Sequence, residues 1–409
     1  MMHSVIKNKG TILPVLLVMA GVSVFFMSCV EKKMTLKEAK QVSVSMRQSS
    51  FVPPPRSIDD ILSVLNQPGK FNKNITAAIV KKADAKPPDT DDPGTLAEFF
   101  RDRGTSAKDL GRSDQELQDA RTALSYARKT DKMTPKGMSN LLKHLGSAEV
   151  RLGNFKTGQA VLREGIDLFP TGSHYHLLAE TLFKVGDFKG GSQLIKEGID
   201  FCNKHEEKSG GKRSQKIQAD RARLNAIYYG SLGQYKKAEM YWREFQTILE
   251  TAKANRAAIF LMSNYFLAKN LKSQGRLIEA ELQIREGLKG AVAHAGKNSG
   301  LTASMASFFA EILLDQGRID DAQKIILASI DCYEKAGVRK DSLVLSKAKV
   351  LLGGVAFARK DFQGATKQFQ DVKKDMALNQ YYYNTKIMQN HNMMICFLIS
   401  GHVEDTMNS

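Results

Sequence analysis

Cysteine, proline and tryptophan are scarce in this chain of 409 residues, which has four, ten and one of them respectively. Beyond the first thirty residues the cysteines are Cys202, Cys332 and Cys396, widely spaced and odd in number, so no disulfide framework is predicted. We interpret them as small apolar packing residues. Cys202 and His205 make a C-x-x-H pair, but no second pair lies nearby at the spacing of zinc ligands, and no metal site is expected.

Motifs of known enzyme chemistry are also missing. The sequence has no G-x-x-x-x-G-K-[ST] phosphate loop, no G-x-S-x-G nucleophile elbow and no H-E-x-x-H zinc motif. His174 and His176 are two positions apart, which on a helix points them about 200° apart and makes a poor metal pair. We therefore expect a protein that is not an enzyme and that uses no cofactor or metal.

The first thirty residues have the layout of an export signal. A short basic start is followed by an uncharged apolar run over residues 11–27 and then by a small residue and a cysteine. The end of this segment, "FMSC", resembles the bacterial lipobox, although Phe26 stands where leucine is usual. The resemblance implies that residues 1–28 are a lipoprotein signal peptide and that Cys29 becomes the lipid-bearing first residue of the mature chain.

Two alternatives to a lipoprotein remain open. The apolar run is at the short edge of the roughly 17 to 25 residues that a spanning helix needs, so an uncleaved anchor or plain secretion is one of them. The other is that the segment is not a leader. The lipoprotein interpretation predicts a protein of the bacterial cell envelope, held to the membrane through lipid on Cys29 and facing the periplasm or the exterior.

Residues 29–94 are predicted to form a flexible tether with one short helix. The first part is polar and ends in "FVPPPR", whose prolines favour an extended chain. Ser57 then opens "SIDDILSVL", in which Ile58, Ile61 and Leu65 fall on one helical face. A polar stretch, "KADAKPPDTDDPG", separates this helix from residues 95–409, where nearly everything has helical period.

One turn signature recurs through residues 95–409. A glycine is followed by a large apolar residue two positions on and a small residue five positions on, as in "GQYKKA" from Gly233 and "GRIDDA" from Gly317. The glycine anchors are Gly111, Gly153, Gly186, Gly233, Gly275 and Gly317, and weaker copies begin at Lys360 and Gly401. The anchors are 33 to 47 residues apart, which predicts an all-α solenoid of helical hairpins.

The physical reason for the signature is the shape of a tight helical hairpin. Glycine adopts the left-handed backbone conformation that commonly ends a helix. The apolar residue is expected to pack back into the hairpin, and the small residues let the two helices approach closely. Period, turn and small positions together resemble the tetratricopeptide repeat (TPR), most clearly in "LLKHLGSAEVRLGNFKTGQAVLREGIDLFP".

The TPR resemblance covers residues 95–409 and implies about seven repeats. The last repeat is predicted to be incomplete, because few residues follow the turn at Gly401. An insertion over residues 203–215 is predicted to be a mobile basic loop. The resemblance also implies a concave face, lined by the first helix of each hairpin, on which partner proteins bind.

The inward positions of those first helices, counted from each turn, carry many cations. The predicted groove residues are Lys143, Arg151, His176, Lys184, Arg223, Tyr265, Lys269 and Lys272. Together with a formal net charge of +17, they predict a groove that binds an acidic segment of a protein partner. Nucleic acid is not the expected partner, because aromatic residues are not interleaved with the cations and export argues against it.

A second resemblance concerns the front of the array. The succession "FVPPPRSIDDILSVL" and "LAEFFRDRGTSAKDLGRSDQELQDA" is similar to the N-terminal part of bacterial TPR proteins that continue into a CHAT domain, a caspase-like peptidase. It implies an alternative function, the regulatory TPR half of a peptidase whose catalytic half is missing or encoded separately. Cys332 and Cys396 fall inside predicted repeat helices and are not candidates for its nucleophile. The main prediction is a non-catalytic scaffold or adaptor.

Overall fold

The computed structural model describes residues 53–66, 73–206, 211–251, 257–340 and 342–377. Within these ranges it contains sixteen α-helices and no strand. The described residues from Pro54 onward belong to one compact unit. The predicted leader, Cys29, Cys396 and the predicted incomplete repeat at Gly401 lie outside the described residues.

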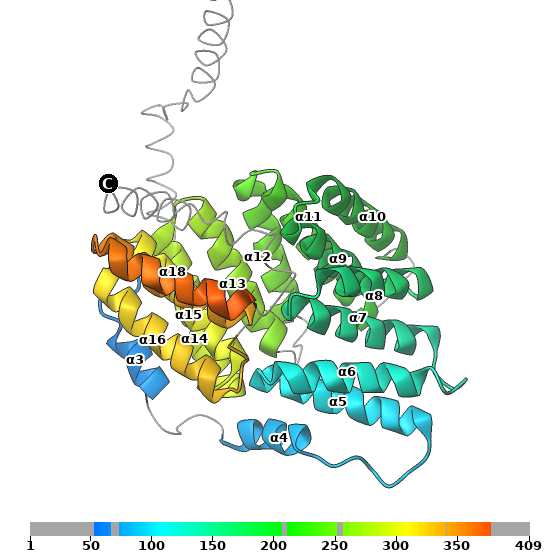
Figure 1. Ribbon diagram of the computed structural model, residues 1–409. Helices are drawn as coiled ribbons and strands as arrows, with labels where there is room; N and C mark the ends of the chain where they lie inside the picture. Colours follow the sequence, from blue (N-terminus) through cyan, green and yellow to red (C-terminus); the bar gives the residue numbers. More distant parts are fainter. Residues whose placement is uncertain (1–52, 67–72, 207–210, 252–256, 341, 378–409) are drawn as a thin grey trace, which may run out of the picture. The chain divides into compact units, whose positions relative to one another are not determined.

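The helices follow one another mostly in pairs joined by short turns (Figure 1). Two shorter helices come first, α3 (Asp59–Asn66) and α4 (Lys73–Ala83). Seven hairpins follow in the described residues: α5 (Pro93–Leu110) with α6 (Ser113–Ala127), α7 (Pro135–Arg151) with α8 (Phe155–Leu168), α9 (Gly172–Lys184) with α10 (Phe188–Glu206), α11 (Gly211–Ser231) with α12 (Tyr235–Thr251), α13 (Ala257–Ser273) with α14 (Leu277–Ala295), α15 (Gly300–Asp315) with α16 (Ile319–Lys335), and α17 (Leu343–Ala358) with α18 (Phe362–Ala377). This confirms the predicted all-α solenoid of TPR-like helical hairpins.

Two segments differ from the sequence-based expectation. Between residues 29 and 94 one helix was predicted, and the described part contains two, because α4 follows α3. The loop predicted over residues 203–215 is largely helical, since α10 continues to Glu206 and α11 begins at Gly211. The side chain of Glu206 pairs with Arg221 and accepts a hydrogen bond of 2.9 Å from Gln218, which joins the two helices.

Each hairpin turn is formed around a residue in the left-handed conformation. At the first turn the amide of Arg112 donates to the carbonyl of Ala107, and the amide of Gly111 donates to Lys108, the pattern that satisfies the last carbonyls of a helix. The six glycine anchors have φ between 71° and 91°: Gly111, Gly153, Gly186, Gly233, Gly275 and Gly317. The seventh anchor is Lys360, with φ of 64°. The repeated glycine therefore ends the first helix of each hairpin, as predicted.

We expect Lys360→Gly to stabilise the last described hairpin by up to about 1 kcal/mol, because the left-handed conformation costs a residue with a side chain roughly that much. Gly275→Ala should destabilise its hairpin by a similar amount, since Gly275 has φ of 74° but nothing within 4 Å of an added Cβ. Urea unfolding followed by circular dichroism measures both changes. If the two substitutions changed the free energy of unfolding in the same direction, this explanation of the turns would be wrong.

Small residues bring the two helices of a hairpin close together. A Cβ added at Gly146 would lie 2.6 Å from Cγ of Leu162, and one added at Gly158 would lie 2.5 Å from Cγ2 of Val150. Real side chains do not come so near, so each glycine is required by the packing. In the later hairpins the place five positions after the anchor is filled by fully buried alanines, Ala238, Ala280, Ala322 and Ala365.

The apolar residue two positions after the anchor does not always pack into the hairpin as expected. Phe155 is 5% exposed, but Phe188 is 55% exposed. Phe188 instead stacks on Phe183 at the end of its hairpin, with ring centroids 6.0 Å apart. The position lies at the rim of the hairpin, where one ring face can contact the first helix while the other stays open to water.

The first helices of the hairpins form one layer. Helix α9 packs against α7 and α11, and helix α15 packs against α13 and α17. Each second helix packs between its own first helix and that of the next hairpin, as α8 does between α7 and α9. We call the layer of first helices the inner layer and the layer of second helices the outer layer.

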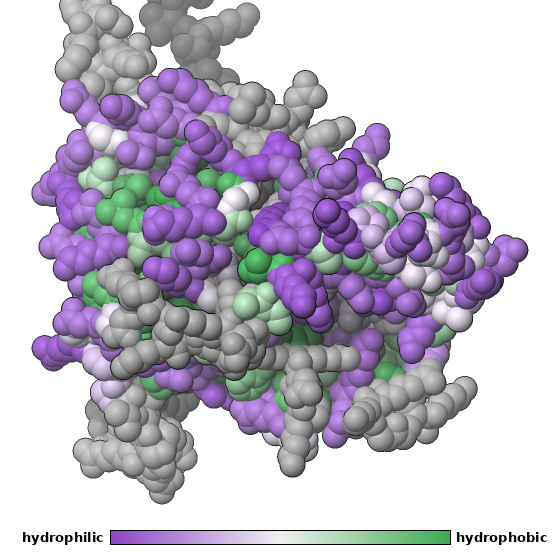
Figure 2. Space-filling view, turned by 90° about the horizontal axis from the view of Figure 1, so that it is seen from below, coloured by the Kyte–Doolittle hydropathy of each residue, from purple (hydrophilic) through white to green (hydrophobic). Residues whose placement is uncertain are grey.

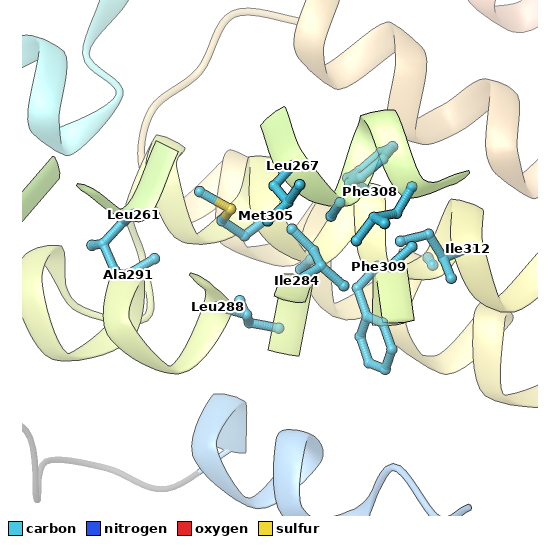
Figure 3. Close-up of a cluster of buried hydrophobic side chains, with 14 of the residues drawn as sticks. Leu261, Leu267, Ile284, Leu288, Ala291, Met305, Phe308, Phe309 and Ile312 are labelled. Carbon is cyan, nitrogen blue, oxygen red and sulfur yellow. The ribbon is translucent and has the colours of Figure 1, made fainter. Parts of the chain in front are cut away.

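The largest apolar cluster fills the space between these layers from α11 to α16. Its centre is contributed by α13, α14 and α15 (Figure 3), with the side chains of Leu261, Leu267, Ile284, Leu288, Ala291, Met305, Phe308, Phe309 and Ile312. Three residues of the N-terminal segment, Ile58, Ile61 and Leu65, belong to the same cluster. The core of the middle repeats therefore extends to α3.

The first hairpin also packs against the sixth, far along the chain. A Cβ added at Gly111 would lie 3.1 Å from the amide nitrogen of Gly300 and 3.3 Å from Cβ of Ala336. Asp114 forms an ion pair of 3.2 Å with Arg339, and α5 packs on α15. The sixth hairpin thus contacts the first, so the helices of the inner layer curve around the face that they share.

Candidate binding site on the inner layer

All eight predicted groove residues belong to inner-layer helices: Lys143 and Arg151 to α7, His176 and Lys184 to α9, Arg223 to α11, and Tyr265, Lys269 and Lys272 to α13. They precede their turn anchors by ten, six, three or two residues. Residues at such spacings share one face of a helix. The structure therefore places the eight residues on corresponding faces of four first helices, and their role in binding stays a prediction.

This face of the inner layer is concave. Lys184 is exposed to solvent, yet desolvation by surrounding protein is the largest cause that lowers its pKa. The charge of Glu180 raises the pKa, while those of Lys347 on α17 and Lys269 on α13 lower it, although neither helix is next to α9 in the layer. The contact of the first hairpin with the sixth supports the same conclusion, because it curves the inner layer toward this face.

Two of the predicted groove cations are already paired with acids of neighbouring first helices. The ammonium of Lys272 lies 2.7 Å from Asp315 and 3.0 Å from Glu311. Partial burial lowers its pKa, but the two carboxylates outweigh this and raise the pKa of Lys272 on balance. Arg223 forms an ion pair of 3.2 Å with Glu180. These pairs join neighbouring first helices and leave little net charge on Lys272 and Arg223 for a ligand.

Arg151 is paired with a carboxylate in the outer layer. Its guanidinium binds Glu116 of α6, which is buried and also lies 3.3 Å from Nε2 of His144. Burial raises the pKa of Glu116, but Arg151 and His144 lower it on balance, so the carboxylate stays charged. Glu116 occupies the small-residue place of the first hairpin, and this pairing explains why an acid is tolerated there. Lys143 donates a hydrogen bond of 3.2 Å to Asn140 of its own helix.

Tyr265 and the histidines of α9 are packing residues. Burial lowers the pKa of His176 well below 6.5 and raises the pKa of Tyr265, so both are neutral at pH 7. The Tyr265 ring packs on Phe308, with centroids 4.7 Å apart. His174 is fully buried, with Nδ1 2.8 Å from Thr171 Oγ1, and burial lowers its pKa to about 4. These side chains pack beneath the inner face and add no charge to it.

Three lysines remain as the candidate binding site: Lys184, Lys269 and Lys347. All three are exposed, and among the described residues none of their side chains forms an ion pair or a hydrogen bond. Desolvation is the largest cause that lowers the pKa of Lys347, and the charge of Lys269 adds to it. We refer to Lys184, Lys269 and Lys347 as the inner lysine cluster.

Sequence analysis missed Lys347 and selected cations that are paired. Lys347 lies thirteen residues before Lys360, one turn further along the same helical face, and its hairpin lacks the glycine from which inward positions were counted. To find it, the count would have had to start from Lys360 in place of glycine and continue one turn beyond the ten residues used for the other helices. The acids that neutralise Lys272 and Arg223 lie in other hairpins, so no local pattern indicated them.

The inner face also offers buried donors. Nε of Arg151 and Nε of Arg223 are buried and have no hydrogen-bond acceptor among the described residues. Such groups can donate to water or to the oxygen atoms of a ligand. Their position beside the inner lysine cluster favours an anionic ligand.

Exposed lysines alone do not distinguish this site from the rest of the surface. Figure 2 shows one face of the molecule with hydrophilic side chains over most of it and hydrophobic ones between them. Exposed lysines such as Lys156 on α8 and Lys324 on α16 belong to the outer layer. What distinguishes the inner lysine cluster is that its members converge from three helices on a concave face.

The described cysteines do not suggest chemistry. Cys202 and Cys332 are unpaired and buried, and burial raises the pKa of their thiols to about 12 and about 11, which agrees with their interpretation as packing residues. Nδ1 of His205 lies 2.8 Å from the carbonyl oxygen of Phe201 in its own helix. In the described ranges no three His, Cys, Asp or Glu side chains are placed to hold a metal. None of the helices described here has the length and apolar content that crossing a membrane requires.

Comparisons with known proteins give only distant similarities. No family model and no curated protein matches the sequence. Among solved structures, the chain is similar to a Rap protein complexed with Competence and Sporulation Factor, at 13% identity over 82% of this chain and 99% of that one, with a TM-score of 0.47. It is similar to BtubC (BKLC) from P. vanneervenii, at 20% identity over 57% of this chain and 92% of that one, with a TM-score of 0.40. It is also similar to the TPR-like repeats of a putative kinesin light chain from Podosopora anserina, at 20% identity over 50% and 94% of the two chains, with a TM-score of 0.36. Similarities at this level identify neither a family nor a function.

Proposed function

We propose that this protein is a non-catalytic scaffold or adaptor whose concave inner face binds an acidic segment of a partner protein. The observation that supports it best is the inner lysine cluster, three exposed ammonium groups from α9, α13 and α17, none of which forms an ion pair within the described residues. Glu180 and Glu311 attract Lys184 and Lys347, but the pKa of each lysine is still lowered on balance. An acidic segment would relieve their mutual repulsion. Charges act more strongly in such a surrounded site than on an open surface.

The paired residues beside the cluster would limit what can bind. Glu180, Glu311 and Asp315 lie on the same face and repel acids that approach outside the cluster. Like charges brought together at an interface cost binding free energy and suppress wrong alignments. We therefore expect the site to select segments whose acidic residues are grouped rather than spread along the chain.

A labelled peptide with Glu residues grouped at its centre and Ser residues at both ends, the Glu-Ser peptide, is expected to bind the purified chain. A Gln-Ser peptide of the same layout and length is not. Binding of the acidic peptide should weaken steeply between 0.1 M and 1 M salt, because screening shortens the range of charge interactions from about 10 Å to about 3 Å. Fluorescence anisotropy measures both effects. Equal affinity for the two peptides, or affinity that does not change with salt, would exclude the proposal.

We also propose that the mature protein is anchored to the cell envelope through lipid on Cys29. The support is the order of basic start, apolar run and "FMSC" in the sequence. One acyl chain holds a protein to a membrane only marginally, so firm anchoring requires more than one. Mass spectrometry of the mature N-terminal peptide should show Cys29 with at least two acyl chains. An intact leader or an unmodified Cys29 would show that the anchor is not of this kind.

The regulatory half of a CHAT-type peptidase stays a prediction that rests on sequence resemblance alone. Among the described residues, Cys202 and Cys332 are buried with raised thiol pKa values, the opposite of what a nucleophilic cysteine needs. Any peptidase activity would therefore belong to another region or a separate chain.

A further inference from the structure

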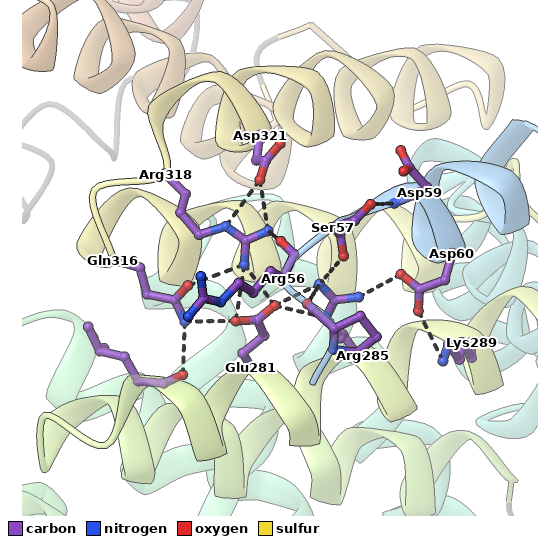
Figure 4. A network of polar contacts seen from close by, with 12 residues as sticks. Arg56, Ser57, Asp59, Asp60, Glu281, Arg285, Lys289, Gln316, Arg318 and Asp321 are labelled. Carbon is purple, nitrogen blue, oxygen red and sulfur yellow. Dashed lines mark hydrogen bonds and ion pairs between the residues drawn. The ribbon is translucent and has the colours of Figure 1, made fainter. Parts of the chain in front are cut away.

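The N-terminal segment over residues 54–66 contacts α14 and the start of α16 in the way that a bound peptide does (Figure 4). Nη2 of Arg285 donates to the backbone carbonyls of Pro55 and Ser57, at 3.2 Å and 3.0 Å. Nη2 of Arg318 donates to the carbonyl of Arg56. Two arginines of the repeats thus bind three consecutive carbonyls of a non-helical segment, so they recognise its main chain.

A buried charge network fixes the start of α3 at this site. Arg285 is 1% exposed and forms ion pairs with Asp60, at 2.6 Å, and with Glu281 of its own helix, at 2.7 Å. Lys289 reaches the other oxygen of Asp60, at 3.2 Å. The guanidinium of Arg285 also lies over the ring of Phe309, 5.0 Å from its centroid. The segment is therefore held by specific ion pairs as well as by apolar contacts.

The apolar side of α3 completes the docked state. Ile58, Ile61 and Leu65 are buried in the largest core cluster. A helix of eight residues is too short to be stable alone in water. The helical state of α3 therefore depends on its contacts with the repeats.

The chain after α3 connects this site to the first hairpin. Asp84 forms an ion pair with Arg112, the carbonyl of Ala83 accepts from Gln115, and the carbonyl of Ala85 accepts from Arg103 at 3.1 Å. Helix α4 packs on both α5 and α14. The described residues before and after residues 67–72 thus contact both the first hairpin and the pair of helices α14 and α16.

Direct contact between the first and the sixth hairpin is small by comparison. It consists of the backbone approach of Gly111 to Gly300, the neighbouring Ala336, and the ion pair of Asp114 with Arg339. Both partners of that ion pair are about half exposed or more, and exposed pairs contribute little to stability. The contacts made by the described residues before and after residues 67–72 therefore provide most of the attachment.

We propose that the face formed by α14 and α16 is a docking site whose occupant is the segment over residues 54–66 of the same chain, acting as a detachable latch. Docked, the latch holds the first hairpin against α15 and keeps the inner face enclosed. Released, it lets the first hairpin separate and opens the inner face to a partner. The latch follows the predicted tether directly, so a pull on the tether would act on α14.

Hydrogen exchange on the full chain tests the latch without any ligand, so its failure is separate from failure of the proposed function. Ile61→Asp places a charge in the core and is expected to release α3. Amides of α5 and α6 should then exchange at least tenfold faster, while those of α7 to α10 keep their rates. Ser63→Asp adds the same charge on the exposed side of α3. It should neither release α3 nor change the exchange rates of α5 and α6.

A milder pair of variants covers the case in which Ile61→Asp unfolds the chain. Asp60→Ala removes the partner of Arg285 and Lys289, whereas Asp59→Ala removes an exposed neighbour. Only Asp60→Ala is expected to speed exchange in α5 and α6. If Ile61→Asp and Asp60→Ala speed exchange in α3 and α14 but leave α5 and α6 unchanged, the segment is only a cover and the latch is wrong.

A chemical crosslink between the two hairpins provides an independent test of the latch. In the Ile61→Asp chain with Asp114→Cys and Arg339→Cys, joining the two cysteines by a flexible, cleavable crosslinker should return the exchange of α5 and α6 to its original rate, and cleaving the crosslinker should raise it again. Failure of the crosslinked chain to recover would contradict the latch. Exchange of α3 in the unaltered chain should also be independent of protein concentration. A concentration dependence would assign the occupant to a second copy and overturn the proposal.

Discussion

Reversing the three residues of the inner lysine cluster, with Lys184→Glu, Lys269→Glu and Lys347→Glu, is expected to weaken binding of the Glu-Ser peptide at least about 100-fold. Each reversal replaces an attraction of about 1 kcal/mol in water by a repulsion of similar size, and the surrounded site strengthens both. Anisotropy titrations at 0.1 M salt measure the change. The effect is large because all three charges act on one segment of the ligand.

A matched variant separates this site from general attraction by a basic protein. Lys156→Glu, Lys189→Glu and Lys324→Glu change the net charge equally, but these exposed residues belong to the outer helices α8, α10 and α16. We expect them to weaken binding less than about threefold, because their charges are screened from the inner face. Equal losses in the two variants would mean that no localised site exists.

The reversal should not reduce folding stability. Lys184 and Lys347 form no ion pair within the described residues. Desolvation and neighbouring cations outweigh the attraction of Glu180 and Glu311, because the pKa of each lysine is lowered on balance. Replacing them relieves repulsion, so the thermal midpoint should stay the same or rise. Residues that bind a ligand often reduce the folding stability of the free protein. A fall in the midpoint would show that the cluster has a structural role.

Arg285→Ala is expected to destabilise the middle repeats by about 3 kcal/mol. Removing one partner from a buried ion pair costs roughly 3 to 5 kcal/mol, because the other is left buried and uncompensated. Glu281 still accepts from Arg318, at 3.1 Å, and from Gln316, at 2.9 Å, so we place the loss at the low end. Hydrogen exchange of the α14 amides measures it locally, since repeat arrays need not unfold in a single step.

Two further variants test the cause of that loss. Lys289→Ala removes a partly exposed cation from the same network and should cost less than about 1 kcal/mol. Combining Arg285→Met with Glu281→Leu removes both buried charges, which often restores stability, and should recover more than half of the loss. If Arg285→Ala were no worse than Lys289→Ala, the network would not be what holds α3.

Much of the fold could be predicted because its determinants are local. A left-handed turn needs glycine at one position, and a close helix pair needs small residues at two others, so Gly153, Gly146 and Gly158 indicate a hairpin without reference to the rest of the chain. The return of the array to its first hairpin could not be predicted, because curvature accumulates from small rotations between hairpins. Docking of α3 was equally hidden, since Asp60 and Arg285 are 225 positions apart.

The candidate site was predictable only to the level of a helix face. The count from each turn placed Lys184 and Lys269 on the inner layer, where the structure has them. It could not tell which cations were already paired, because Lys272 meets its acids in the next hairpin. Pairing between hairpins depends on their mutual rotation, and no periodicity in the sequence records it.

Site-specific photo-crosslinking tests most directly the claim that the inner face binds an acidic segment. A photoreactive residue at Ser273, which is exposed on α13 two positions before Gly275, would probe the inner face. One at Lys324 on α16 would probe the outer layer. In solubilised membranes, Ser273 is predicted to crosslink to a partner segment with grouped Asp and Glu residues, and to lose that product when the inner lysine cluster is reversed. A product formed only from Lys324, or a neutral or basic segment captured at Ser273, would contradict the claim.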